Sequence, residues 1–253
     1  MFNPLDHPFL ILVASLSAFW VSAQIGAWFR KKTRNVEESV ADDFTFVLGG
    51  IMTLLALITG FTFSMALGRY EQRKNYEEQE ANAIGTEYGR ANLLPAADAA
   101  KVQALLRSYL EQRILNYKSR NKQQLRQIDA QTARLQADLW SAVVTPAAAQ
   151  PGPAAALVLS GMNDVLNSQG YTQAAWRNRI PSAAWILLIT ISILCNLLVG
   201  YGAHRGRRFL FLILPFALSI SLFLIADIDS PRGGAIRVGP QNLESLAEYL
   251  HSQ

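Results

Sequence analysis

Four long runs without a charged residue most constrain the fold of this chain of 253 residues. A bilayer core of about 30 Å needs roughly 20 apolar residues in a helix that rises about 1.5 Å per residue. In chain order the runs have 21, 25, 24 and 18 residues, so each meets or approaches that length. One such run is also compatible with a buried core helix, but four runs flanked by charges favour membrane spans. They are residues 9–29, 44–68, 180–203 and 209–226.

The first run has a cleaved signal peptide as its alternative interpretation. Its basic residues, Arg30, Lys31 and Lys32, follow the apolar stretch. A signal peptide carries such residues before its apolar stretch, and residues 1–7 contain no Lys or Arg. We therefore expect a retained transmembrane helix.

Composition excludes several classes of protein. Hydrophobic residues make up 51% of the chain, which is too many for disorder, and charged residues only 17%. The single Cys195, within an apolar run, excludes a disulfide framework and a cysteine-based zinc site. The histidines His7, His204 and His251 are scattered. We expect no metal site and no cofactor.

Residues 69–179 differ in composition and form the extramembrane part of the expected fold. They hold 14 of the 23 Lys and Arg residues and 10 of the 19 Asp and Glu residues, so they supply the net charge of +4 (14 − 10). Helix-forming residues dominate, and β-branched residues are scarce. The sequence thus predicts an all-α polytopic membrane protein with four transmembrane helices. Its segments are residues 1–68 (helices 1 and 2), 69–179 (helical region), 180–226 (helices 3 and 4) and 227–253 (tail).

Two details of this helical region can be predicted. Leucine and other apolar residues from Leu125 to Leu139 recur every three or four positions, which indicates one buried helix face. The proline-rich stretch 145–153 predicts a helix stop and a linker, followed by a short helix over residues 157–167.

The second apolar run is where we expect a functional surface. Small or polar residues recur there at the spacing of one helix face, with Leu57 as the large exception. One interpretation is close helix packing, because small residues let backbones approach in lipid. The other is a pore lined by several copies, with Leu57 or Phe61 as an apolar constriction that gates by dewetting. The pore-lining candidates are Thr53, Leu57, Gly60, Phe61, Ser64 and Gly68.

The same helix is expected to continue beyond the membrane to about Asn92, since no proline occurs before Pro95. Arg69 and Arg73 follow the pore candidates directly. They either extend to lipid headgroups or form an electropositive vestibule that concentrates anions. The carboxylates beyond them, Glu77, Glu78, Glu80 and Glu87, are expected to form a solvated face with ion pairs four residues apart, such as Arg73 with Glu77.

Six separated motifs carry a resemblance to a known family: GGI (49–51), GFTFSMALGRYE (60–71), EANAIGT (80–86), LLP (93–95), RIP (179–181) and DIDSPRGG (227–234). They resemble the bacterial and plant membrane family known as bestrophin-like, which is distantly similar to bestrophin anion channels. Bestrophins are pentameric, calcium-gated anion channels whose second helix lines the pore. The resemblance implies an oligomeric, anion-permeable channel in the bacterial inner membrane, with Leu57 and Phe61 in its neck.

Two points stay open beside this resemblance. The long acidic run that binds calcium in bestrophins is missing, and Asp227 and Asp229 cannot alone supply the six to eight oxygens that calcium takes, so a polar turn that pairs them with Arg232 is favoured. The resemblance places residues 69–179 in the cytoplasm. The positive-inside rule instead places the two short basic loops, 30–43 and 204–208, in the cytoplasm, and residues 69–179 on the other side of the membrane.

Other functions have less support. Motifs for metalloproteases, dinucleotide binding and nucleoside triphosphate binding are absent, so we expect no enzyme. Acidic residues alternate with the basic ones, so we expect no nucleic-acid partner. Two hypotheses remain. The first is a homo-oligomeric channel for inorganic anions in the lipid bilayer. The second is a non-conducting membrane scaffold or sensor that recruits partners through its helical region.

Overall fold

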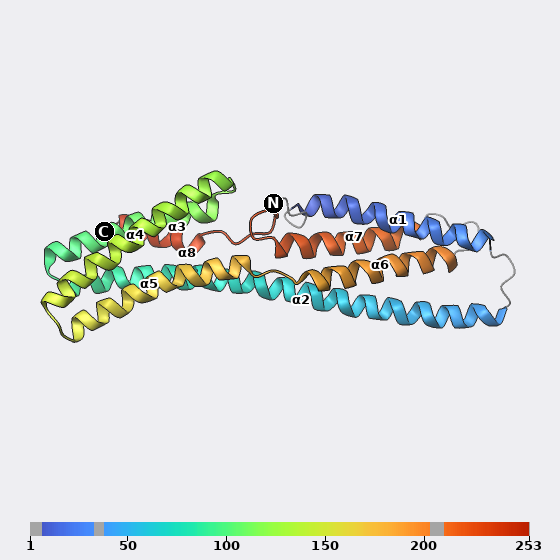
Figure 1. The fold of residues 1–253 in the computed structure, drawn as a ribbon, viewed down its shortest axis with the longest axis horizontal. Coiled ribbons are helices and arrows are strands. Elements are labelled where there is room, and N and C mark those ends of the chain that lie inside the picture. Colours follow the sequence, from blue (N-terminus) through green and yellow to red (C-terminus); the bar gives the residue numbers. More distant parts are fainter. Residues whose placement is uncertain (1–6, 33–37, 203–209, 253) are drawn as a thin grey trace. The chain divides into compact units, whose positions relative to one another are not determined.

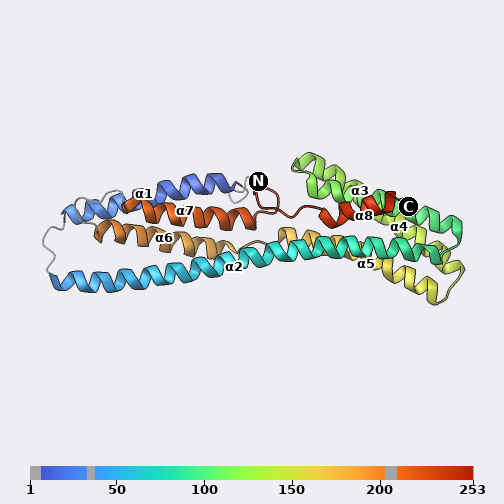
Figure 2. The ribbon, with the colours of Figure 1, turned by 180° about the vertical axis from the view of Figure 1, so that it is seen from behind.

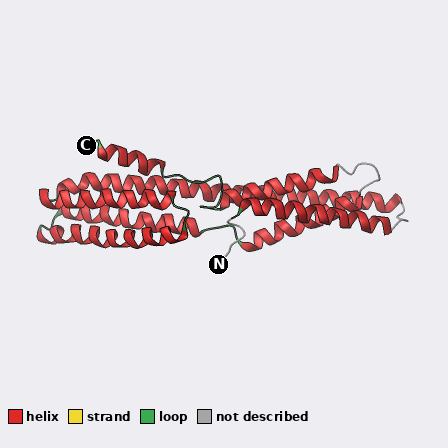
Figure 3. Cartoon of the chain, turned by 90° about the horizontal axis from the view of Figure 1, so that it is seen from above, coloured by secondary structure: helices red, strands yellow, loops and turns green. Residues whose placement is uncertain are grey.

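The computed structural model describes residues 7–32, 38–202 and 210–252, and these residues form helices joined by loops, with no strand among them (Figure 1, Figure 3). The predicted all-α class is confirmed. The elements are α1 (Pro8–Lys32), α2 (Glu38–Arg90), the short 3₁₀ helix η2 (Ala91–Leu93), α3 (Ala96–Lys118), α4 (Lys122–Ala149), α5 (Pro153–Arg177), α6 (Ser182–Gly202), α7 (Leu210–Asp229) and α8 (Gln241–His251).

Four helices in the described part of the chain are long and apolar enough to cross a membrane. They are α1, α2, α6 and α7, which cover most of the four charge-free runs. The predicted continuation of the second span is also confirmed, because α2 is one helix of 53 residues. At about 1.5 Å per residue, it is about 80 Å long.

The chain divides into two compact units, Met1–Tyr70 with Arg179–Arg237 and Glu71–Asn178 with Val238–Gln253. We call the first the apolar unit and the second the helical unit. The apolar unit places α1, α6, α7 and the first part of α2 side by side (Figure 2). Its core contains Phe19 of α1, Leu55 and Ala66 of α2, Trp185, Leu188 and Cys195 of α6, and Leu222, Ile225 and Ala226 of α7.

Two glycines set the closest approach in the apolar unit, where α1 meets α6. A Cβ atom at Gly26 would lie 1.9 Å from the backbone oxygen of Leu197, and one at Gly200 would lie 1.9 Å from the backbone oxygen of Ala23. These distances are far below van der Waals contact, so both positions require the absence of a side chain. Small residues commonly permit such crossings in lipid.

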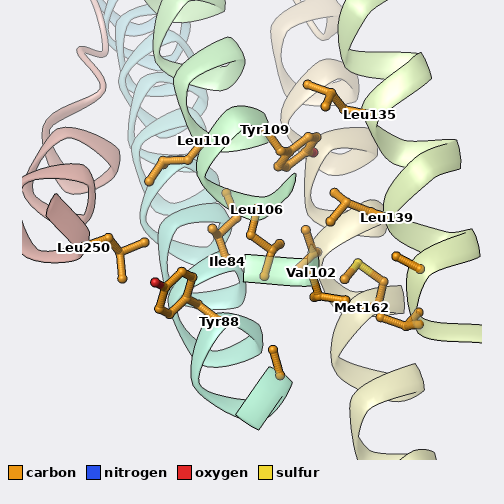
Figure 4. Close-up of a cluster of buried hydrophobic side chains, with 14 of the residues drawn as sticks. Ile84, Tyr88, Val102, Leu106, Tyr109, Leu110, Leu135, Leu139, Met162 and Leu250 are labelled. Atoms are coloured by element: carbon orange, nitrogen blue, oxygen red, sulfur yellow. The ribbon is translucent and has the colours of Figure 1, made fainter. Parts of the chain in front are cut away.

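The helical unit packs α3, α4, α5 and α8 around the second part of α2 (Figure 4). Ile84 of α2 and Val102, Leu106 and Tyr109 of α3 are fully buried in this core. The apolar face predicted for residues 125–139 is confirmed, because it supplies Leu135 and Leu139 of α4 to the same core.

The helix stop and linker predicted within residues 145–153 are confirmed, because α4 ends at Ala149 and α5 begins at Pro153. Pro146 lies inside α4, and the helix ends only at Ala149. The carbonyl oxygen of Pro146 still accepts a hydrogen bond from the Gln150 backbone N–H at 3.0 Å. Pro146 is also buried, so packing offsets the loss of the one backbone hydrogen bond that a proline cannot donate. The short helix predicted for residues 157–167 is in fact the middle of the 25-residue α5, which has Pro153 in its first turn.

The glycine crossing generates a stability prediction. We expect Gly26→Ala to lower the free energy of unfolding by about 1–3 kcal/mol, because the added methyl group overlaps backbone atoms of α6. Thermal unfolding of the purified chain in detergent measures this change. Gly49→Ala is the matched control, since no atom lies within 4 Å of a Cβ at Gly49. Equal stability of the two variants would contradict the close crossing.

Candidate functional site

The second span, residues 44–68, presents two different faces in the structure. One face is covered within the apolar unit: Leu55, Thr62 and Ala66 are buried, and Ile51 and Ile58 are partly buried. Leu55 and Ala66 belong to the core of that unit, and Ile51 and Ile58 pack against it. Their spacing of three or four residues is that of a single helix stripe. We call it the bundle-facing stripe.

The sequence-predicted pore face lies on the opposite side of the same helix. Its members Thr53, Leu57, Gly60, Ser64 and Gly68 each follow a residue of the bundle-facing stripe by two positions. Two residues turn an α-helix by about 200°, which places the two stripes back to back. All five residues are exposed in the single chain, and so is the neighbouring Phe61.

Exposure of this face distinguishes between the two interpretations of its small residues. No atom lies within 4 Å of a Cβ built at Gly60 or Gly68, whereas the glycines of the α1–α6 crossing meet backbone atoms. The small residues of α2 therefore do not serve helix packing among the described residues of one chain. They leave a face that is available to another copy, to lipid or to water.

The exposed face combines apolar bulk with small polar groups. Leu57 and Phe61 are 52% and 65% exposed, and they lie one helical turn apart. The hydroxyl group of Thr53 donates a hydrogen bond to the backbone oxygen of Gly49 at 2.9 Å, so its polarity is partly satisfied within the helix. This arrangement can provide an apolar ring between weakly polar surfaces when several copies surround an axis.

The two arginines of the predicted vestibule differ in burial. Arg69 is partly buried, and Arg73 is only 2% exposed. A buried guanidinium attracts solvated anions less than an exposed one, because it is not presented to water. The vestibule stays a prediction, and Arg69 is the better placed of its two residues.

The expected solvated face of carboxylates beyond the membrane is wrong. Glu78 is exposed, but Glu77, Glu80 and Glu87 are at most 1% exposed. Glu80 forms a buried ion pair with Arg113, a residue of α3. Glu77 instead receives hydrogen bonds from α8, at the backbone N–H groups of Asn242 (2.9 Å) and Leu243 (3.0 Å).

The turn after the fourth span uses its carboxylates for backbone hydrogen bonds. Asp227 is 1% exposed, and its two oxygens accept from the backbone N–H groups of Ala235 at 2.8 Å and Ile236 at 2.7 Å. Asp229 accepts from the Ile180 N–H at 3.1 Å. No group of three or more His, Cys, Asp or Glu side chains that could hold a metal ion occurs among the described residues. These bonds support the polar-turn interpretation of Asp227.

Comparisons with known proteins identify the fold. A sequence profile described as Bestrophin-like domain matches residues 10–243. A crystal structure of a bacterial bestrophin homologue from Klebsiella pneumoniae, phased with zinc, superimposes with a TM-score of 0.67 at 16% identity, over 96% of this chain and 95% of that one. A single-residue variant of that homologue gives a TM-score of 0.68 at 14% identity, over 96% and 97%. At these identities the likeness establishes the fold. A comparison of this sequence with curated proteins found no match.

The turn generates a prediction on metal removal. We expect Asp227→Ala to lower the free energy of unfolding by about 2 kcal/mol or more, because two backbone N–H groups lose their acceptor. We also expect EDTA or added calcium to leave the unfolding temperature of the unaltered protein unchanged, since the Asp227 oxygens are occupied. A rise in unfolding temperature with calcium that Asp227→Ala abolishes would instead establish a metal site.

Proposed function

Because the chain belongs to the bestrophin-like family, we propose that it is a homo-oligomeric, anion-permeable channel whose pore is lined by α2. Several copies, five by analogy with bestrophins, surround one axis in the bacterial inner membrane. The helical unit lies in the cytoplasm, as it does in bestrophins.

The exposed face of the second span is the observation that carries this proposal. In its most apolar window, only 6% of α2 is buried inside the chain, against 22% for α1 and 44% for α7. Each of the other spans thus has a larger share of its residues buried within one chain than α2 has. In addition, the side chains of Thr53, Gly60 and Ser64 are smaller and more polar than those expected on a helix face that contacts only acyl chains.

Leu57 and Phe61 form the gate in this proposal. Around an axis, one apolar side chain per copy narrows the pore and favours its dewetting, while the small residues above and below leave wider, wettable sections. The lining has no charge between residues 44 and 68, so selectivity depends on charge outside the membrane. Residues 69–179 carry a net charge of +4 (14 − 10), and Arg69 is closest to the lining, which favours anions over cations.

Cysteine labelling tests whether the proposed face is wet. We expect Ser64→Cys, in a Cys195→Ser background, to react with a membrane-impermeant charged thiol reagent, because Ser64 faces water in the pore. Ile186→Cys is the control, since Ile186 is 65% exposed on α6 and faces lipid in the proposed assembly. A cysteine at position 64 that reacts no faster than one at 186 would show that this face is dry.

Flux through liposomes tests the gate. We expect Phe61→Ala and Leu57→Ala to raise the chloride flux of the reconstituted protein several-fold, because a smaller side chain widens and wets the constriction. Ile186→Ala is the matched control and should leave the flux unchanged, since it removes an equally exposed apolar side chain from another helix.

The same assay separates the channel from the scaffold hypothesis. No chloride flux over a range of calcium, pH and voltage, together with stable partner proteins in a detergent pull-down, would favour the non-conducting scaffold.

A further inference from the structure

Three carboxylates of α2 are buried in the helical unit, and two of them form hydrogen bonds or an ion pair with other helices. Glu80 pairs with Arg113 and accepts a hydrogen bond from the hydroxyl of Thr172 at 3.2 Å. Glu77 accepts two backbone N–H groups at the start of α8 and the side-chain amide of Asn242 at 2.6 Å. Such partners stabilise the charged form of a buried carboxyl group.

Glu87 is buried without such partners. Its side chain has 0% exposure, and both of its oxygens are buried with no hydrogen-bond partner. It lies against α5 at Gly161, where an added Cβ would be 2.0 Å from Oε2 of Glu87. The absence of a side chain at Gly161 is therefore what gives the carboxyl group its place between the two helices.

Burial raises the pKa of Glu87 to about 8, from an ordinary value of 4.5. Two charged groups act on it from the packed elements. Arg90, on the same helix, lowers this pKa, and Asp164, on α5, raises it further. The effect of burial exceeds that of Arg90, so the neutral acid predominates at pH 7.

We propose that Glu87 makes the packing of α2 against α5 weaken as the pH rises: the carboxyl group is neutral while the helices are packed, and its ionisation loosens them. Ionisation releases one proton to bulk water and leaves a charge that no described donor solvates. A buried carboxylate without a hydrogen-bond donor is strongly unfavourable, and the nearby Arg90 does not offset its burial, so it must gain water. Water reaches it when α5 moves away from α2 around Gly161.

The direction of the pH effect follows from linkage. Between pH 4.5 and about 8 the unfolded chain has lost the Glu87 proton, whereas the packed helical unit retains it. The packed state then binds more protons, so its stability falls as the pH rises through this window and levels off above pH 8. For one proton, the equilibrium between packed and loosened states changes by up to about tenfold per pH unit.

Infrared titration of the full chain in detergent tests the protonation state. We expect the unaltered protein to show a protonated carboxyl band at pH 7 that disappears with a midpoint near pH 8. Glu87→Gln should lack this band, and Glu78→Gln, which changes an exposed carboxylate of the same helix, should keep it. Asp164→Asn, an exposed substitution, should move the midpoint to lower pH, because it removes a like charge. Absence of the band, or its persistence in Glu87→Gln, would overturn the proposal.

Hydrogen exchange tests whether ionisation loosens the helices. We expect protection factors of the α5 amides, corrected for the intrinsic pH dependence of exchange, to fall between pH 6 and pH 9 in the unaltered protein and in Glu78→Gln. In Glu87→Gln they should stay constant. Equal pH dependence in all three proteins would overturn the proposal, whatever the infrared result.

A consequence for transport rests on the proposed channel function, because α2 also carries the proposed pore lining. Chloride flux in liposomes should then change between pH 6 and pH 9, and Glu87→Gln should remove that change. Absence of all flux, with the infrared and exchange results as expected, would reject the channel and leave the pH sensitivity of the helical unit established.

Discussion

Lipid offers no hydrogen-bond partner to a peptide group, and the whole structure depends on how the chain meets this constraint. A helix satisfies its own backbone, so the four charge-free runs have to be helical where they cross the membrane. The second run goes further, because α2 continues as one helix into the helical unit. One element therefore has an apolar section with a bundle-facing stripe and a second section whose buried face carries Glu77, Glu80 and Glu87.

The sequence was sufficient to predict the class and the spans, because run length and the absence of charge are local properties. It also predicted the continuous α2, since proline is the strongest local signal against a helix. It did not predict that three glutamates of α2 are buried. A carboxylate is expected in water unless a partner is known, and the partners here are distant along the chain: Arg113 is 33 residues from Glu80, and Asn242 is 165 residues from Glu77.

Periodicity alone could identify the candidate pore face but could not determine whether this face packs against another helix of the same chain. Thr53, Gly60 and Ser64 have the spacing of a packing surface as well as that of a pore lining. The structure adds the position of the other spans, which pack against the opposite face of α2, at Leu55, Ile58 and Ala66. The proline-rich stretch 145–153 holds a helix end, as predicted, but Pro146 itself is buried inside α4, so a local signal gave the break without its exact residue.

The hydrogen bonds between Glu77 and α8 have a consequence for biosynthesis. Glu77 is made early, and the backbone groups that it binds are made 165 residues later, after both α6 and α7. Until then its buried carboxylate lacks these donors, so the helical unit cannot reach its final packing while the ribosome is still translating the third and fourth spans. Synthesis of all four spans thus precedes completion of the helical unit, and a nascent chain stalled before residue 241 would expose the surface that α8 covers.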